Sequence, residues 1–264
     1  MNLNLKDIYN LCLNHHAEVQ NVPDVVPNSM PIPYFGDIIA YLNSPIRILT
    51  AALNPSNREF EGGRFDVENG RSGAEGLEFE LSNYFKNRPY YGWFSSFEPV
   101  LRGLAASYGG KMAMGPYKST ALHLDMCSPI ATDPTWSRLD VGTKFQLTPT
   151  GKIVFESLLA ALKPEIVIAS VAWPHLRDWN DEFRAGAKWE SLVTYNQTWS
   201  INSGMGGALK SPIKVQIKVL ERNGDNKLLF VNGSAANTPF GRFKIERKEE
   251  VGRILRETLQ KLGI

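Results

Sequence analysis

Two short apolar runs, one near each end of the chain, stop at an Asn that is followed two residues later by Ser. Residues 46–53 are rich in Ile, Leu and Ala and lead into Asn54. Residues 227–231 read Lys-Leu-Leu-Phe-Val and lead into Asn232. Such runs are typical of strands in a parallel sheet, and open α/β sheets bind ligands at the carboxyl ends of their strands. The pattern therefore predicts a site that contains both Asn residues.

Other apolar patterns predict helices and further strands around these two runs. Helical spacing covers residues 6–20, 77–87, 94–108, 149–163 and 251–262. Strand patterns cover residues 119–126, 165–171 and 215–222, and the last of these is expected to form a hairpin with residues 227–231. Thr148-Pro149 is expected to begin its helix, and residues 180–211 are expected to be irregular. We predict one three-layer α/β domain over residues 1–264, with a short, mostly parallel central sheet flanked by helices. Residues 1–33 are expected to be an N-terminal extension made of a helix and a loop.

The composition excludes several classes of protein. With only Cys12 and Cys127, the chain cannot supply a four-cysteine iron–sulfur or zinc site, and few cysteines fit a reducing cytoplasm. No apolar run reaches 18 residues, so no membrane-spanning helix is expected. Residues 205–264 carry 12 Lys or Arg against 6 Asp or Glu, which fits either a phosphate-binding face or a solvated one.

Three segments resemble, in order, the motifs of the uracil-DNA glycosylase superfamily. Residues 52–56, Ala-Leu-Asn-Pro-Ser, are similar to its Gly-X-Asn-Pro-Gly first motif, although Ala52 replaces the Gly. Residues 232–234, Asn-Gly-Ser, resemble its His-Pro-Ser or Asn-Pro-Ser second motif, with Gly233 in place of Pro. Residues 124–129, Leu-Asp-Met-Cys-Ser-Pro, look like the central strand end, where one branch has an Asn two residues before a Cys. The resemblance spans residues 34–262 and implies a uracil-DNA glycosylase-like domain.

The resemblance implies monofunctional base excision, in which a flipped nucleotide loses its base by hydrolysis without metal, cofactor or covalent nucleophile. Asn54 would orient the attacking water, and Asn232 would hydrogen-bond the base or its leaving-group charge. Ser234 would hold a phosphate. Phe240 or Arg242, in the segment that corresponds to the family's wedge loop, would fill the vacated stack. The alternative for each Asn is a turn residue that ends a strand.

Three positions bear on which base is bound. Asp125 stands where a uracil-binding enzyme carries an amide, and a carboxylate accepts from the N4 amine of cytosine. Its alternative is a helix cap or a partner for Arg. Ser56 stands where strict uracil enzymes have a Tyr that blocks C5 substituents, so it leaves room for one. Phe65, or less favourably Phe60, is expected to stack on the flipped base, and a core Phe is the alternative.

The segment from Glu59 to Glu80 carries seven Asp or Glu residues against two Arg. This excess of acid suits hydrogen bonds to sugar hydroxyls, or a solvated loop. Together these features favour a cytoplasmic, monomeric DNA glycosylase that excises a C5-modified cytosine, such as hydroxymethylcytosine or its glucosylated form in phage DNA, as an antiviral defence. The alternatives are a repair enzyme for uracil or another deaminated base, and a non-catalytic binder of modified nucleic acid. DNA is the expected partner in each case.

Overall fold

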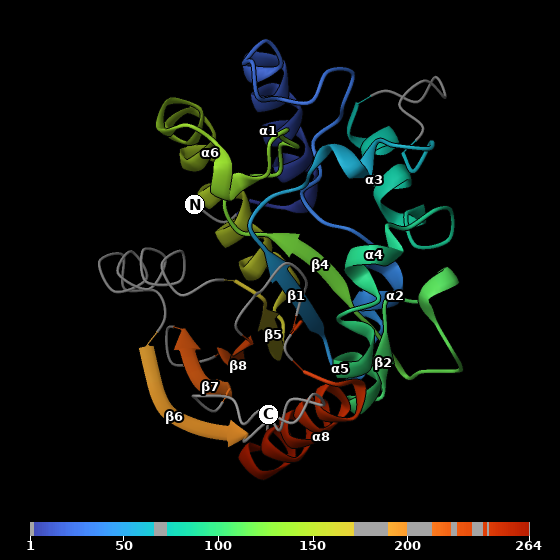
Figure 1. The fold of residues 1–264 in the computed structure, drawn as a ribbon, viewed down its shortest axis with the longest axis vertical. Helices are drawn as coiled ribbons and strands as arrows, with labels where there is room; N and C mark the ends of the chain where they lie inside the picture. Colours follow the sequence, from blue (N-terminus) through green and yellow to red (C-terminus); the bar gives the residue numbers. More distant parts are fainter. Residues whose placement is uncertain are drawn as a thin grey trace, which may run out of the picture.

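The computed structural model describes residues 3–65, 73–171, 190–199, 213–222, 226–233, 240–241 and 243–263. Its central sheet has six strands in the order β4-β1-β5-β8-β7-β6 (Figure 1). The strands are β1 (Ile48–Ala52), β4 (Leu122–Asp125), β5 (Ile166–Ala169), β6 (Glu190–Trp199), β7 (Ile213–Arg222) and β8 (Asn226–Gly233). The first four in the sheet order are parallel, and β7 and β6 continue the sheet antiparallel. The predicted α/β class and mostly parallel sheet are confirmed.

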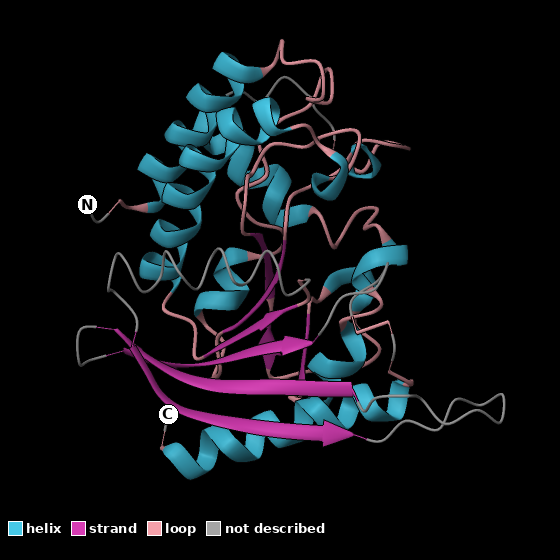
Figure 2. Cartoon of the chain, turned by 60° about the vertical axis from the view of Figure 1, so that its left-hand side comes forward, coloured by secondary structure: helices cyan, strands magenta, loops and turns pink. Residues whose placement is uncertain are grey.

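Helices flank the sheet on both sides (Figure 2). They are α1 (Leu5–Val19), α2 (Ile38–Leu42), α3 (Gly73–Asn83), α4 (Tyr91–Phe94), α5 (Glu98–Gly103), α6 (Val141–Leu162) and α8 (Ile245–Leu262). Short 3-10 turns occur at η1 (Asn57–Glu59), η2 (Gly110–Met112) and η3 (Trp136–Arg138), and a separate small parallel pair is formed by β2 (Ala106–Ser107) and β3 (Ser119–Thr120). Among the described residues, no helix combines the length and hydrophobicity needed to cross a bilayer.

Most expected elements are present, including the β7–β8 hairpin, but three expectations were wrong. Strand β6 lies inside residues 180–211, which were expected to be irregular. The expected helix over residues 94–108 is divided into α4, α5 and β2. Helix α6 begins at Val141, so Pro149 lies inside it. Asp140 is the N-cap of α6, because its side chain accepts a hydrogen bond from the Thr143 N–H at 3.0 Å. This cap starts the helix eight residues before the predicted Pro149.

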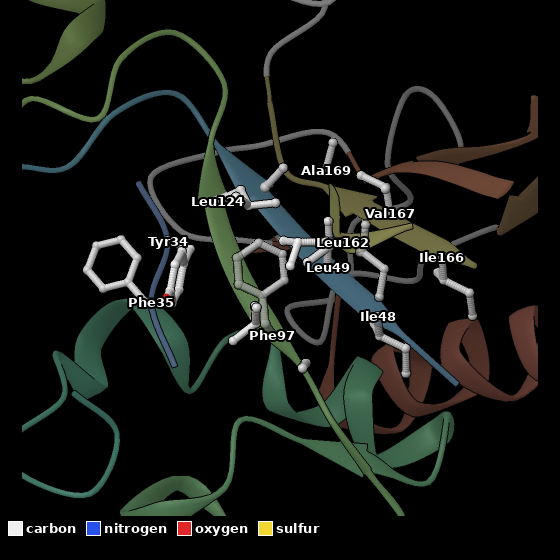
Figure 3. Packing of buried hydrophobic residues seen from close by; sticks show 14 of the residues in the cluster. Tyr34, Phe35, Ile48, Leu49, Phe97, Leu124, Leu162, Ile166, Val167 and Ala169 are labelled. Carbon is white, nitrogen blue, oxygen red and sulfur yellow. The ribbon is translucent and has the colours of Figure 1, made fainter. Parts of the chain in front are cut away.

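The core lies on the parallel strands (Figure 3). All four residues of β5 and all four of β4 are buried, and β1 is buried along its whole length. Helix α5 crosses α8 closely because both carry a glycine at the contact. A Cβ atom on Gly103 would lie 2.1 Å from the Glu249 carbonyl oxygen. The N-terminal helix joins the same core through Ile8, Tyr9 and Cys12, so it is part of the packed fold.

Candidate functional site

The predicted site segments lie at the carboxyl edge of the parallel strands. The chain runs from β1 to its neighbour β4 and then returns past β1 to β5, so the strand order reverses at β1. Ligands of open α/β sheets bind outside the strand ends at such a reversal. In register, Ala52 pairs with Asp125, and Ala169 pairs with Asn232. The ends of β4, β1, β5 and β8 therefore form one edge.

Asn54 is half-buried in the turn after β1, and both ends of its amide are in use. Its Nδ2 donates to Thr132 Oγ1 at 2.7 Å, and its Oδ1 accepts from the Trp136 N–H at 3.3 Å. An amide has two hydrogens and two acceptor sites, so one donor and one acceptor remain for a water. Asn54 is thus held in one orientation, as a residue that positions water must be.

Ser56 follows in the same turn and is also half-buried. Its carbonyl accepts from the Glu59 N–H at 3.1 Å, and its side chain makes no hydrogen bond to the η1 backbone. The turn is tied to the opposite loop, because the Thr132 N–H donates to the Pro55 carbonyl at 3.2 Å. Ser56 therefore contributes a small side chain to a rigid segment.

Asp125 ends β4 with a side chain that is only 3% exposed. Within the described part of the chain, its Oδ1 atom is buried and has no hydrogen-bond partner. His123 Nε2 lies 3.6 Å from this same Oδ1 atom, which is within ion-pair range but too far for a hydrogen bond. His123 and Asp125 lie on one face of β4, because side chains two residues apart in a strand do. Within the described ranges, Asp125 neither caps a helix nor pairs with an Arg.

A buried hydrogen-bond chain fixes His123. Its Nδ1 lies 2.7 Å from Thr50 Oγ1, which lies 2.5 Å from the Tyr108 hydroxyl. Burial raises the pKa of Tyr108 well above its usual value, so this phenol keeps its proton. Thr50 Oγ1 also lies 3.4 Å from the Leu122 carbonyl oxygen, so its single hydrogen has two acceptors within reach and the contacts fit either tautomer of His123. The imidazole itself is packed by Phe35, Phe94 and Phe97.

Phe65 and Phe60 form an aromatic pair that is connected to His123 through the ring of Phe35. Phe65 is buried and stacks on Tyr84, with ring centroids 4.9 Å apart and an interplanar angle of 30°. Phe60 is half-buried, and its ring centroid is 5.7 Å from that of Phe65. Phe35 contacts both Phe65 and His123, which links the aromatic cluster to β4.

Glu59 is buried in this cluster, although the acidic segment from Glu59 to Glu80 was expected to be a solvated loop or to reach sugar hydroxyls. The Tyr84 hydroxyl donates to Glu59 Oε2, and the same hydroxyl accepts from the Tyr90 N–H at 2.9 Å. Burial raises the pKa of Glu59 to about 8, and the negative charge of Asp125 adds to this rise. Glu61 fits the solvated expectation, because it is exposed and pairs with Arg58 at 2.8 Å.

Asn232 lies at the end of β8, on the opposite face of the sheet from Asp125. The register places it beside Ala169, which pairs with Ala51, whereas Asp125 pairs with Ala52. In the amide orientation that satisfies its hydrogen bonds, Nδ2 donates to the carbonyls of Ala169 at 3.1 Å and Val171 at 3.3 Å. The side-chain oxygen is then the group left to meet a ligand. An acceptor can bind a base N–H, but it does not stabilise negative charge on a leaving base.

Phe240 contradicts the predicted wedge role. Its ring is fully buried, with centroids 6.3 Å from Phe97 and 5.9 Å from Phe243. Its backbone has φ of 51°, which is costly for a bulky residue, and its N–H lies 3.4 Å from Ser170 Oγ. A wedge must be exposed to enter a base stack, and this side chain is part of the core. The other two predicted DNA contacts, Ser234 and Arg242, lie outside the described residues.

Asn54, Ser56 and Asp125 thus lie at or just after the ends of the neighbouring strands β1 and β4, and the Phe60–Phe65 pair is linked to β4 through Phe35 and His123. An open depression between α2 and α3, lined by Asp37, Ile39, Phe79 and Lys86 among others, contains none of the predicted site residues. In the described ranges, no group of three His, Cys, Asp or Glu side chains is arranged to hold a metal.

Sequence reasoning missed His123 and Thr50, and it gave Glu59 no place in the site. A signal existed for His123, because the Leu-His-Leu-Asp pattern of β4 places two polar side chains on one face of a buried strand. No comparable signal distinguishes Glu59 from the acidic residues around it. No protein-family model matches the chain, and no curated protein is significantly similar to it.

Proposed function

We propose that this protein is a monofunctional DNA glycosylase, similar in type to the uracil-DNA glycosylase superfamily, that excises a C5-modified cytosine. The observation that carries the proposal is the buried Asp125 carboxylate, whose Oδ1 accepts no hydrogen bond from the described residues, at the end of β4 beside the strand that leads into the rigid Asn54 turn. An unsatisfied buried acceptor costs about 1–3 kcal/mol. A ligand that donates an N–H removes that cost, and the N4 amine of cytosine is such a donor.

The chemistry requires the bond between C1′ of the sugar and N1 of the base to break. The bonding electron pair leaves with the base, water adds to C1′, and a proton passes to the base or to solvent. Asn54 is a weak base, so its role is to orient the water rather than to remove its proton. Its two hydrogen bonds to residues 132 and 136 support this role because they fix the amide before substrate arrives.

The cluster of Phe60 and Phe65 supports a flat ligand, because aromatic faces stack on a flipped base. The small side chain of Ser56 supports a substituent at C5, such as a hydroxymethyl or glucosylated hydroxymethyl group. Selectivity for the substituent is needed, since excision of ordinary cytosine would damage the host genome. Defence against phage whose DNA carries such bases is the biological role that fits this selectivity.

The decisive experiment uses DNA oligonucleotides that differ at one base: uracil, cytosine, hydroxymethylcytosine or glucosylated hydroxymethylcytosine. Each is incubated with the protein as single strand and as duplex, and alkali then cleaves any abasic site. We expect cleavage at the modified cytosines alone. Cleavage at uracil alone would favour the repair alternative and contradict the role of Asp125.

A non-catalytic binder is the second candidate, because the Asn54 amide already has a partner at each end and this arrangement also suits a purely structural turn. Retention of modified DNA in a gel-shift assay, with no abasic site formed over hours, would favour that candidate.

A further inference from the structure

We propose that this protein forms a two-fold symmetric dimer, in which an exposed apolar ridge of α6 packs antiparallel against the same ridge of a second copy. The ridge consists of Val141, Phe145, Pro149 and Ile153 and is called the α6 ridge below. The inference concerns an interaction surface and does not depend on the proposed function. A dimer in solution would replace the monomer expected from the sequence.

The α6 ridge is an exposed apolar patch on a single helix. Val141 is 83% exposed, Phe145 is 79% exposed and Ile153 is 52% exposed, and Pro149 between them is also exposed. Each of these residues follows the previous one by four positions, so the four side chains lie next to one another along one row of the helix surface. The row spans about 18 Å of helix length. Contiguous exposed apolar patches mark interaction sites, whereas scattered apolar residues do not.

The opposite face of α6 is already covered. Leu147, Val154 and Leu158 are buried, and the helix packs beside α1 (Figure 1). Gly151 lies so close to the segment after β4 that a Cβ atom there would be 1.9 Å from the Cys127 carbonyl oxygen. Helix α6 is therefore apolar both on its covered face and along the exposed ridge. A helix that is apolar all round is normally covered all round, which predicts a partner on the ridge.

A second copy of the chain fits the α6 ridge because the ridge is self-complementary. A two-fold axis at the middle of the ridge places Val141 opposite the partner's Ile153 and Phe145 opposite the partner's Pro149. Large and small rings then alternate at the centre, with β-branched side chains at both ends. Rows of side chains with a spacing of four interdigitate in the commonest class of helix packing. Because both copies use the same patch, the contact closes as a dimer.

The charges at the two ends of the ridge are complementary under the same symmetry. Arg138 and Asp140 lie at the N-terminal end, and Lys152 and Glu156 lie at the C-terminal end. The antiparallel arrangement brings Arg138 toward the partner's Glu156, and Asp140 toward the partner's Lys152. A parallel arrangement would place each charge beside its own equivalent. Complementary charges at the rim of an interface select the orientation of the partner more than they add affinity.

The size of the ridge predicts a weak dimer. Covering one Phe side chain removes about 150–250 Å² from water, so the four side chains together account for about 400 Å² per copy. Specific interfaces of standard size cover about 800 Å² per partner. The ridge thus supplies the apolar centre of an interface, and the surrounding polar residues supply the rest. We expect association at micromolar protein concentrations.

Sedimentation velocity of the full chain, from about 1 µM to about 200 µM, measures the dimer without DNA and without cleavage. We expect the unmodified protein to pass from monomer to dimer over this range. Phe145→Ser should raise the dissociation constant on the order of 30-fold, because a central aromatic side chain carries much of the binding energy. Met114→Ser is the matched control, because Met114 is 78% exposed but lies outside α6, and it should leave the dissociation constant unchanged.

Charge reversal tests the orientation. Arg138→Glu and Glu156→Arg should each weaken the dimer about threefold, whereas the double variant should restore it. Failure of the double variant to restore the dimer would overturn the antiparallel arrangement. A dimer that Phe145→Ser leaves unchanged would overturn the inference altogether.

A monomer at every concentration would also overturn the inference. Binding of the unmodified protein, but not of Phe145→Ser, to vesicles of phosphatidylcholine and phosphatidylglycerol would then assign the ridge to a lipid surface. Each of these outcomes leaves the proposed glycosylase activity untouched, because that activity is judged from cleavage of modified DNA.

Discussion

The two halves of the parallel sheet are built from different side chains, although both are buried. In β5 and in the buried segment 228–231 of β8, the side chains are entirely apolar. In β1 and β4, Thr50, His123 and Asp125 lie at equally buried positions. Parallel strands covered on both faces are normally apolar throughout. The half formed by β1 and β4 thus has polar side chains at buried positions where apolar side chains are the usual, more stabilising choice.

Within that half, the polar groups differ in how well they are satisfied. Thr50 forms hydrogen bonds with His123 and Tyr108, whereas Asp125 Oδ1 has no hydrogen-bond partner among the described residues and only His123 Nε2 at 3.6 Å. Satisfied buried networks make a structure rigid, and unsatisfied groups cost free energy. The contrast suggests that the network supports a group whose partner comes from outside the chain. The half formed by β5 and β8 supplies the framework, and the following four predictions test this division.

The largest effect is expected for Asn54→Ala. Loss of the amide that orients water should reduce excision of hydroxymethylcytosine by about 10²–10³-fold, with DNA affinity changed less than about twofold. Single-turnover cleavage and anisotropy measure the two quantities. Asn57→Ala is the matched control, because Asn57 lies in the same turn and its side chain donates to Asp133 Oδ2 at 3.0 Å on the surface. Equal losses for both variants would show that the turn, rather than the Asn54 amide, matters.

Glu59→Gln should change how stability depends on pH. Burial raises the pKa of Glu59 in the folded protein to about 8, so the folded state holds a proton that the unfolded chain releases near pH 4.5. Its contribution is fully favourable below pH 4.5 and is lost as the pH rises through 8. Relative to Glu59→Gln, the unmodified protein should lose on the order of 3 kcal/mol between pH 5 and pH 9.

Urea unfolding of both proteins at each pH measures that difference. Glu98 also has a pKa raised by burial, to about 7, but it is present in both proteins and cancels. A constant difference in stability across this range would mean that Glu59 is ionised in the folded protein.

Asp125→Asn is expected to improve stability and impair selectivity. Replacement of a buried carboxyl group whose Oδ1 accepts no hydrogen bond from the described residues should raise the free energy of unfolding by about 1–2 kcal/mol, while preference for modified cytosine over uracil falls about tenfold. Urea unfolding and competition between the two probes give the two values. Lower stability together with unchanged preference would show that Asp125 has a structural partner instead of a ligand.

The sequence predicted the framework better than it predicted the site. The alternating and continuous apolar runs were sufficient for β1, β4, β5 and the β7–β8 hairpin, because burial of strands leaves a local pattern. Asn54 and Asp125 were found because each follows such a run. Other positions could not be predicted, because burial of a polar or aromatic side chain there depends on residues far away in the sequence; these positions are Thr50, Glu59 and Phe240. A buried Glu with Tyr84, 25 residues away, looks in sequence like the exposed Glu61 two positions later.

The smallest effect concerns the support beneath Asp125. Thr50→Val keeps the shape of the side chain but removes the hydroxyl between Tyr108 and His123, so two buried polar groups lose their partner. We expect a loss of about 1–2 kcal/mol in unfolding free energy and a threefold to tenfold loss of excision, because the hydrogen bond that holds the His123 ring beside Asp125 is removed. Ile168→Val, at the position that pairs with Thr50 across β1 and β5, should cost about 1 kcal/mol and leave excision unchanged. If the two variants lose stability and excision in equal measure, the two halves of the sheet differ in composition but not in role.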